Sequence, residues 1–159
     1  MTASQRRDVA EPGGVARLRV TGPGVAARRA GWWVVGAVCA AFAVFEAVKH
    51  GSPASYLFFV GALGPDIPLL AQLGTRHEPG QLYRKAVPFY NVLHFPWLPL
   101  AVIVFFSFYG STNDQAAPGF TLGLTWLAHI AVDRALGYGL RDRNGWQRGA
   151  KSTSDQFGA

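Results

Sequence analysis

Four long apolar blocks restrict the fold of this chain more than any other feature of its sequence. They span residues 31–48, 56–73, 86–109 and 120–140. Each is close to the ~20 residues that a helix needs to cross a bilayer. The blocks are apolar on all sides, whereas a helix of a soluble protein shows one apolar stripe. We therefore predict an all-α polytopic membrane protein, with a bundle of four transmembrane helices over residues 29–141.

The two ends of the chain differ in composition from these blocks. Residues 1–28 are rich in Arg, Gly and Pro, and residues 142–159 are polar without a periodic apolar face. Such segments bury too little apolar surface to offset the entropy lost on ordering. We therefore expect a disordered tail on either side of a single membrane domain. The frequent Ala, Gly and Arg residues are typical of a bacterial protein.

Basic residues are distributed unevenly around the four blocks. Thirteen of the fifteen Lys and Arg residues lie before the first block, between the second and third, or after the fourth. By the positive-inside rule these segments face the cytoplasm, so both termini are predicted to lie inside a bacterial cytoplasmic membrane. The net charge of +6 is then explained by topology and by attraction to membrane lipid. It requires no nucleic-acid partner.

Ionisable side chains interrupt three of the blocks. They are Asp66 in the second block, His94 in the third, and His129 and Asp133 in the fourth. A charged group in hydrocarbon costs at least ~2.5 kcal/mol, so such residues are usually functional. Counted along the helices, all four lie roughly 10–16 Å from the predicted cytoplasmic surface, and His129 and Asp133 share a helix face. We predict that the four side chains meet in one site.

Prolines lie beside two of these residues. Pro65 and Pro68 surround Asp66, and Pro96 closely follows His94. Because each proline removes a backbone donor and disturbs the preceding turn, we expect both helices to be irregular there. Irregular backbone inside a membrane is tolerated where it faces protein or a wet cavity. The prolines therefore favour a built site over a chance grouping of polar residues.

Two carboxylates and two imidazoles form a ligand set that suits Zn²⁺, Fe²⁺ or Mn²⁺. The predicted metal ligands are Asp66, His94, His129 and Asp133. A metal-dependent hydrolase at the cytoplasmic membrane face would use metal-bound water as the nucleophile. Asp66 or Asp133 is the candidate catalytic base of such an enzyme.

Four further polar residues are predicted to support the site. Tyr90 shares a helix face with His94, and Tyr90 and Asn91 are typical interhelical hydrogen-bond partners. Arg134 is expected to neutralise a carboxylate or to reach the phosphate headgroups. Tyr138 belongs to the sequence "GYGL", which indicates close packing and the end of the fourth helix at the inner surface.

Two other functions fit the same residues. One is an ion or small-solute carrier, for which four helices are few, so that this function would favour a homo-oligomer. The other is a scaffold whose polar core only fixes helix packing, with Asp66 capping the helix fragment after Pro65 and His129 bonded to Asp133. The residues alone therefore leave open whether the protein is an enzyme.

Three segments of the sequence carry a family resemblance: "PDIPLL", "YNVLH" and "LTWLAHIAVDRALGYGL". In this order they resemble the domain-of-unknown-function family 4260, small bacterial membrane proteins with four helices, over roughly residues 31–141. The order Asp, His, His, Asp across the helices is also, more loosely, similar to that of membrane-bound metal-dependent hydrolases. The family resemblance implies the fold but no established activity. The positions that it carries are Asp66, Tyr90, Asn91, His94, His129, Asp133, Arg134, Gly137, Tyr138 and Gly139.

Overall fold

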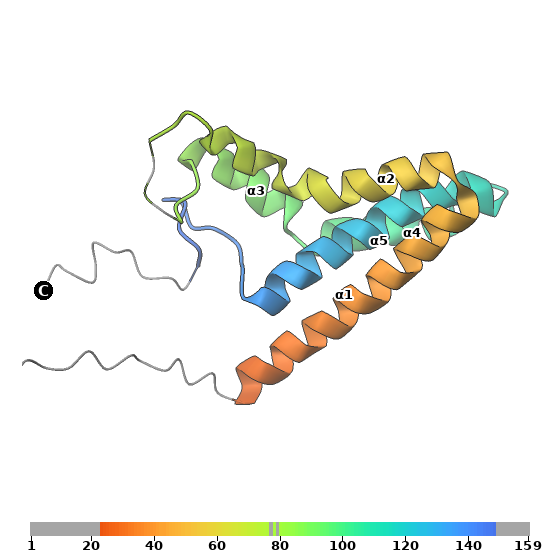
Figure 1. Cartoon of the computed structure of the whole chain (residues 1–159), viewed down its shortest axis with the longest axis horizontal. Helices are drawn as coiled ribbons and strands as arrows, with labels where there is room; N and C mark the ends of the chain where they lie inside the picture. The colour runs from red at the N-terminus through yellow and green to blue at the C-terminus, as the bar shows by residue number, and fades with distance from the viewer. Residues whose placement is uncertain (1–22, 77, 79, 149–159) are drawn as a thin grey trace, which may run out of the picture.

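The structure is a computed structural model, which describes residues 23–76, 78 and 80–148. The described residues form helices and connecting segments, with one isolated β-bridge between Arg141 and Gln147. In chain order the elements are α1 (Pro23–His50), α2 (Ser52–Leu63), the 3-10 helices η1 (Gly64–Gln72) and η2 (Arg84–Ala86), α3 (Val87–Leu93), α4 (Trp97–Phe108) and α5 (Asn113–Leu136). Figure 1 shows them as an elongated bundle.

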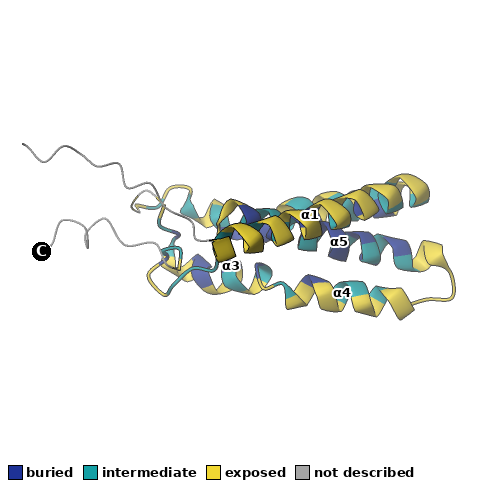
Figure 2. Cartoon of the chain, turned by 90° about the horizontal axis from the view of Figure 1, so that it is seen from below, coloured by how far each residue is buried: buried dark blue, intermediate teal, exposed yellow. Residues whose placement is uncertain are grey.

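Helix α5 is the centre of this bundle. Helices α1, α2 and α4 all pack along it (Figure 1). Ten residues of α5 are buried, and nearly all of them are Ala, Gly or Thr, whereas α1 buries only Gly36 and Ala43. Small residues let helix backbones approach closely, which is how helices associate in a membrane. Figure 2 shows the result, a largely buried α5 between the exposed outer faces of α1 and α4.

Three segments of the described chain are long and apolar enough to cross a membrane. They are Pro23–His50, Ser52–Gln72 and Arg84–Phe108. Their large apolar side chains mostly point away from the protein, as at Phe59 and Phe108. The outward-facing apolar side chains of these segments therefore suit contact with lipid. The prediction of an all-α membrane bundle is confirmed. The fourth block, in α5, is not among these three segments. Helix α5 lies between the other helices and carries more small and polar residues, which lower its mean hydropathy.

The prolines interrupt two of the apolar blocks as predicted. The second block is α-helical only to Leu63 and continues as the 3-10 helix η1, which contains Pro65, Asp66 and Pro68. The third block divides into α3, which ends at Leu93, and α4, which begins after Pro96. Each interruption places a predicted site residue beside irregular backbone.

Two predicted helix boundaries are wrong. The tail prediction for residues 1–28 fails for residues 23–28, because α1 begins at Pro23. Proline is well suited to the first turn of a helix, where its missing N–H would have no partner, and the residues after it include the strong helix formers Ala and Arg. Helix α5 begins at Asn113, so much of the connection predicted before residue 120 is helical. The remaining tail, residues 1–22, lies outside the described residues.

The C-terminal tail prediction is also wrong for its first residues. Helix α5 ends at Leu136, and Gly137 adopts the left-handed conformation with φ of 99°. The chain then folds back, so that the Gly145 carbonyl accepts a 2.9 Å hydrogen bond from the Leu82 backbone. Residues 142–148 are thus packed against the bundle, and residues 149–159 lie outside the described residues.

The bundle has two distinct ends. The basic end comprises the start of α1, residues 73–86 and residues 137–148 (left in Figure 1). The turn end comprises the α1–α2 turn at Gly51 and the α4–α5 connection, residues 109–112. Most basic residues lie at the first of these ends, as the sequence pattern requires, whereas Lys49 lies at the second. The orientation of the bundle in the membrane stays a prediction.

Candidate metal centre

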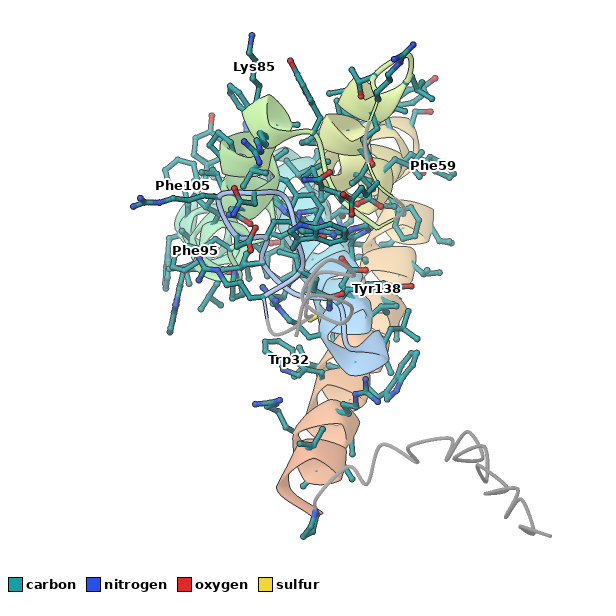
Figure 3. The ribbon with its side chains drawn as sticks, turned by 90° about the vertical axis from the view of Figure 1, so that its left-hand side faces the viewer. Trp32, Phe59, Lys85, Phe95, Phe105 and Tyr138 are labelled. Atoms are coloured by element: carbon teal, nitrogen blue, oxygen red, sulfur yellow. The ribbon has the colours of Figure 1, made fainter. Side chains whose placement is uncertain are left out.

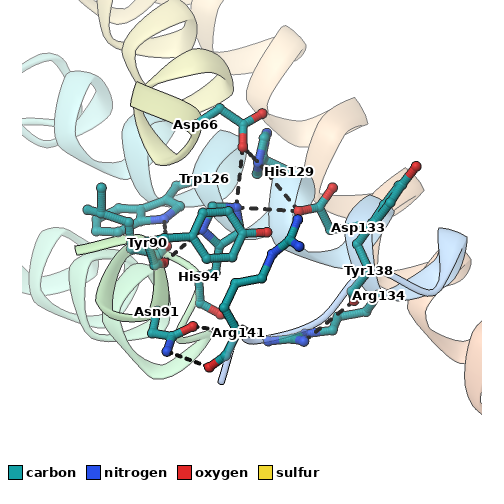
Figure 4. A network of polar contacts seen from close by, with 11 residues as sticks. Asp66, Tyr90, Asn91, His94, Trp126, His129, Asp133, Arg134, Tyr138 and Arg141 are labelled. Atoms are coloured by element: carbon teal, nitrogen blue, oxygen red, sulfur yellow. Dashed lines mark hydrogen bonds and ion pairs between the residues drawn. The ribbon is translucent and has the colours of Figure 1, made fainter. Parts of the chain in front are cut away.

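Four side chains from three elements meet toward the basic end (Figure 4). We call Asp66, His94, His129 and Asp133 the Asp–His cluster. Asp66 Oδ1, from η1, lies 3.5 Å from His94 Nε2 and 3.6 Å from His129 Nε2. Asp133 Oδ2, from α5, lies 3.4 and 3.8 Å from the same two nitrogen atoms. Residues separated by more than 60 positions in the sequence are thus within contact distance.

Three members of the cluster form a compact group of donor atoms. One donor atom each from Asp66, His94 and His129 lies within 4.8 Å of the others, and this set could hold a metal ion. Asp133 contacts both imidazoles but does not belong to this mutual group. The structure therefore brings all four predicted ligands together, with Asp133 in a different position from the other three. Their roles stay predictions at this point.

The hydrogen bond made by His94 Nδ1 fixes the state of the imidazole. Nδ1 lies 2.9 Å from the Tyr90 carbonyl oxygen, which can only accept, so Nδ1 must carry the hydrogen. In the neutral ring, Nε2 then presents a lone pair. Both His94 Nε2 and His129 Nε2 are buried and have no hydrogen-bond partner. A buried polar atom without a partner is costly, and these two face carboxylates rather than donors.

Tyr90 holds the His94 ring from a second side. The two rings stack with centroids 3.8 Å apart and planes inclined by 19°. Tyr90 itself belongs to a small buried cluster with Leu82, Ala86 and Val87. Because the backbone of Tyr90 accepts from the imidazole and its ring covers the imidazole face, His94 has little rotational freedom.

Side chains from α5 satisfy the backbone at the end of α3. Trp126 Nε1 donates to the Leu93 carbonyl at 2.6 Å, and the Arg134 guanidinium donates to the His94 carbonyl at 3.2 Å. The break between α3 and α4, which ends at Pro96, leaves these carbonyls without helical partners. In a membrane such groups must be satisfied by protein. Trp126 was not predicted from the sequence to contribute. The sequence did contain a signal for it: Trp126 lies three residues before His129, so both residues share one face of α5.

A family comparison adds to this geometry. The family model described as "Domain of unknown function (DUF4260)" matches residues 34–150 of the chain. The protein belongs to the DUF4260 family. This confirms the resemblance seen in the three sequence segments, while the looser similarity to metal-dependent hydrolases stays a prediction. No curated protein and no solved structure matches the chain.

Asn91 anchors the C-terminal segment of this DUF4260 protein beside the cluster. Its side-chain amide donates to the Arg141 carbonyl at 2.9 Å and accepts from the Arg141 backbone N–H at 2.8 Å. The Arg141 guanidinium carbon lies 5.5 Å from the centre of the Tyr90 ring, within cation–π range. Asn91 therefore supports the site by fixing a loop. Arg141 was missed by the sequence analysis because it lies beyond the last apolar block.

Arg134 was expected to neutralise a carboxylate or to reach the phosphate headgroups. The ion-pair contacts of Asp133 in the described chain are with histidines, and Arg134 donates to backbone carbonyls. Its contact with headgroups stays a prediction. The helix end predicted at "GYGL" is found, since α5 ends at Leu136 and Gly137 is left-handed. Tyr138 is 52 % exposed, and its carbonyl accepts from Arg134 at 3.5 Å.

A cavity of about 370 Å³ reaches the Asp–His cluster from the side of α2. This volume falls in the range of small-molecule sites. Its wall combines apolar residues with two members of the cluster, so a molecule in the cavity would touch both. The lining residues are Ala62, Thr125, Ala128, His129, Val132 and Asp133.

Proposed function

We propose that this DUF4260 protein binds one divalent transition metal ion, Zn²⁺, Fe²⁺ or Mn²⁺, and is a metal-dependent hydrolase within the membrane. Asp66, His94 and His129 would hold the metal, and Asp133 would act as the catalytic base. The observation that carries the proposal is the hydrogen bond from His94 Nδ1 to the Tyr90 carbonyl. In the neutral ring it leaves Nε2 as a buried lone pair that faces two carboxylates.

The spacing of the donor atoms fits a shared ion. Ligands bound at about 2.0–2.1 Å in tetrahedral geometry lie about 3.3 Å from each other. Among the proposed ligands, Asp66 Oδ1 lies 3.5 Å from His94 Nε2 and 3.6 Å from His129 Nε2. A small inward movement of the side chains would therefore complete a coordination shell. A metal-ligating histidine also typically donates its other N–H to a backbone carbonyl, as His94 does.

A purely ionic network fits these contacts less well. A charge-assisted N–H···O⁻ hydrogen bond is typically about 2.7–2.9 Å long. All four contacts in the cluster exceed this length by half an ångström or more. Two carboxylates close together in a membrane also need positive charge for both to stay ionised. A divalent ion supplies that charge and occupies the space between the donors.

The number of ligands favours a catalytic over a structural metal site. Catalytic zinc sites commonly have three protein ligands and one position open to water or substrate. The metal would supply an acidified water or a polarised substrate oxygen. Asp133 lies on the same face of α5 as His129 and lines the 370 Å³ cavity. Its carboxylate can accept a proton there, while Tyr90 and Arg134 keep the His94 ring and its backbone in place.

The test is the metal content of the full-length protein purified in detergent. We expect close to one transition metal ion per chain and a near-complete loss in His129→Ala. His50→Ala is the matched control, because the His50 side chain is also largely buried but lies at the turn end, in contact with Glu46 and Asp114. Equal metal content in both variants would show that the metal is held elsewhere.

The catalytic part of the proposal needs a separate variant. Asp133→Asn should keep most of the metal but lose metal-dependent hydrolysis, measured with p-nitrophenyl esters of acetate and phosphate as probes. Asp114→Asn, at the turn end, should keep both. Loss of metal together with activity in Asp133→Asn would make Asp133 a fourth ligand instead of a base.

A further inference from the structure

A second and larger cavity lies on the lipid-facing side of the bundle. It measures about 670 Å³ and runs between the α2–η1 segment and the η2–α3 segment, with α5 as its floor. Its walls are almost wholly apolar. Its lining includes Gly61, Pro65, Ala71, Lys85, Phe89 and Leu93. We call this cavity the lipid groove.

Small residues and proline create the groove. Gly61 brings α2 against α5, since a Cβ at this position would lie 2.7 Å from the Leu122 carbonyl oxygen. Beyond it, the chain continues as the 3-10 helix η1, which starts at Gly64 and packs beside α3. Ala71 and Ala86 contribute little side-chain volume farther along. The groove therefore follows from the same helix interruption that places Asp66 in the site.

One charged residue, Lys85, lies among the apolar residues of the lining. It is exposed at the basic end, and Figure 3, viewed from that end, shows its side chain pointing outward from the bundle. A lysine at the end of a membrane segment places its ammonium group at headgroup level. The groove therefore combines an apolar channel in the hydrocarbon region with a cation at its mouth.

We propose that the lipid groove binds one anionic glycerophospholipid, with an acyl chain along Phe89 and Leu93 and the phosphate on Lys85. The volume is within the 300–1,000 Å³ range of ligand sites. Apolar walls suit an acyl chain, and the single positive charge selects an anionic headgroup over a neutral one. This site goes beyond the proposed function, because it does not need the metal.

The position of the groove connects the lipid to the Asp–His cluster. Pro65 and Leu93 line the groove, and the next residue of each, Asp66 and His94, belongs to the cluster. The Trp126 ring also lines the groove while its Nε1 holds the Leu93 carbonyl. A bound acyl chain would therefore cover the backbone that positions two of the proposed metal ligands.

The test is native mass spectrometry of the full-length protein with equimolar phosphatidylglycerol and phosphatidylcholine of identical acyl chains. We expect one retained lipid with about a fivefold preference for phosphatidylglycerol, because one lysine contributes about that factor near a membrane surface. Lys85→Glu should remove the preference. Lys49→Glu, at the turn end, should keep it. The result should be the same after removal of metal by a chelator, which separates this proposal from the metal proposal.

A second variant tests the apolar part of the groove. Ala71 is exposed and lines the groove, so Ala71→Trp should block an acyl chain without overpacking the core, and the retained lipid should be lost. Ala101→Trp, on the exposed surface of α4, is the control and should retain lipid. The proposal is overturned if the protein retains no lipid, or if both tryptophan variants retain it equally. It is also overturned if Ala71→Trp instead dissociates a dimer, because the groove would then hold a second copy.

Discussion

Two clusters at different places in the bundle combine imidazole with a pair of carboxylates, and they differ in how the histidines are bonded. At the turn end, His50 Nδ1 lies 2.6 Å from Asp114 Oδ1 and its Nε2 lies 3.2 Å from Glu46 Oε2. We call these three residues the turn-end cluster. Both nitrogen atoms of His50 thus face carboxylates, and the Asp114 side chain is 87 % exposed.

The Asp–His cluster has the same types of residue and a different bonding pattern, although Nε2 of His50, like that of His94 and of His129, makes no hydrogen bond. One nitrogen atom of His94 is committed to a backbone carbonyl, and the other faces two carboxylates at 3.4 and 3.5 Å without a hydrogen bond. At the turn-end cluster the exposed Asp114 carboxylate is reached by water. In the Asp–His cluster both Nε2 atoms face carboxylates at 3.4–3.8 Å without a hydrogen bond, and a cation among these atoms would satisfy both kinds of group. The proposed metal site therefore differs from the turn-end cluster in the backbone partner of His94 Nδ1, and not in its types of residue.

The largest expected difference between the clusters is their response to metal removal. A ligand that binds only the folded state stabilises it by about 4 kcal/mol at a thousandfold excess over Kd. Chelation should therefore lower the thermal unfolding midpoint of the intact protein and of His50→Ala by several degrees. It should have almost no effect on His129→Ala. A chelator response that is equal in the two variants would remove the distinction between the clusters.

The packing of α2 on α5 should matter for the Asp–His cluster in particular. Gly61→Ala places a Cβ 2.7 Å from the Leu122 carbonyl oxygen and 3.0 Å from the backbone nitrogen of Trp126, so the backbone must move. Overpacking of this kind costs about 1–3 kcal/mol. Gly36→Ala is the control, since its Cβ meets Ala131 at an ordinary 3.4 Å. The thermal unfolding midpoint and the metal affinity should both fall in Gly61→Ala and change little in Gly36→Ala.

The bond from Trp126 to the Leu93 carbonyl should have a moderate effect. Trp126→Phe keeps most of the apolar ring but leaves the carbonyl unsatisfied, at a cost of about 1–2 kcal/mol. Because that carbonyl precedes His94, we expect metal affinity to fall about tenfold, as for other groups that orient a ligand. Trp97→Phe, on the exposed face of α4, should leave both quantities unchanged. Isothermal titration with Zn²⁺ measures the affinity directly.

The smallest effect is expected at the turn end. Asp114→Asn removes an ion pair whose carboxylate is almost fully exposed. Such pairs are worth less than about 1 kcal/mol and weaken with salt. The variant should unfold within a few degrees of the intact protein and keep its full metal content. A large loss of metal here would mean that the two clusters are coupled along α5.

Features that follow from local chemistry were predicted from the sequence, whereas features that depend on packing were not. Charged residues in apolar blocks and the prolines beside them predicted Asp66, His94 and both interruptions, because each follows from local chemistry. The start of α1 at Pro23 was missed, since the composition of the whole tail concealed a short segment of helix formers. The contacts of Trp126 were missed for another reason. The spacing of Trp126 and His129 predicts that they share a face of α5, but the contact with the Leu93 carbonyl depends on how α5 lies against the end of α3, which no pattern along one chain encodes.

The most direct test of the metal site is X-ray absorption spectroscopy on the zinc-loaded full-length protein. The account predicts a first shell at about 2.0–2.1 Å with two imidazole nitrogens and at least one carboxylate oxygen. In His129→Ala the contribution of one imidazole should be absent, and in His50→Ala the spectrum should be unchanged. A first shell of oxygen atoms alone, or a protein that takes up no zinc, would contradict the central claim.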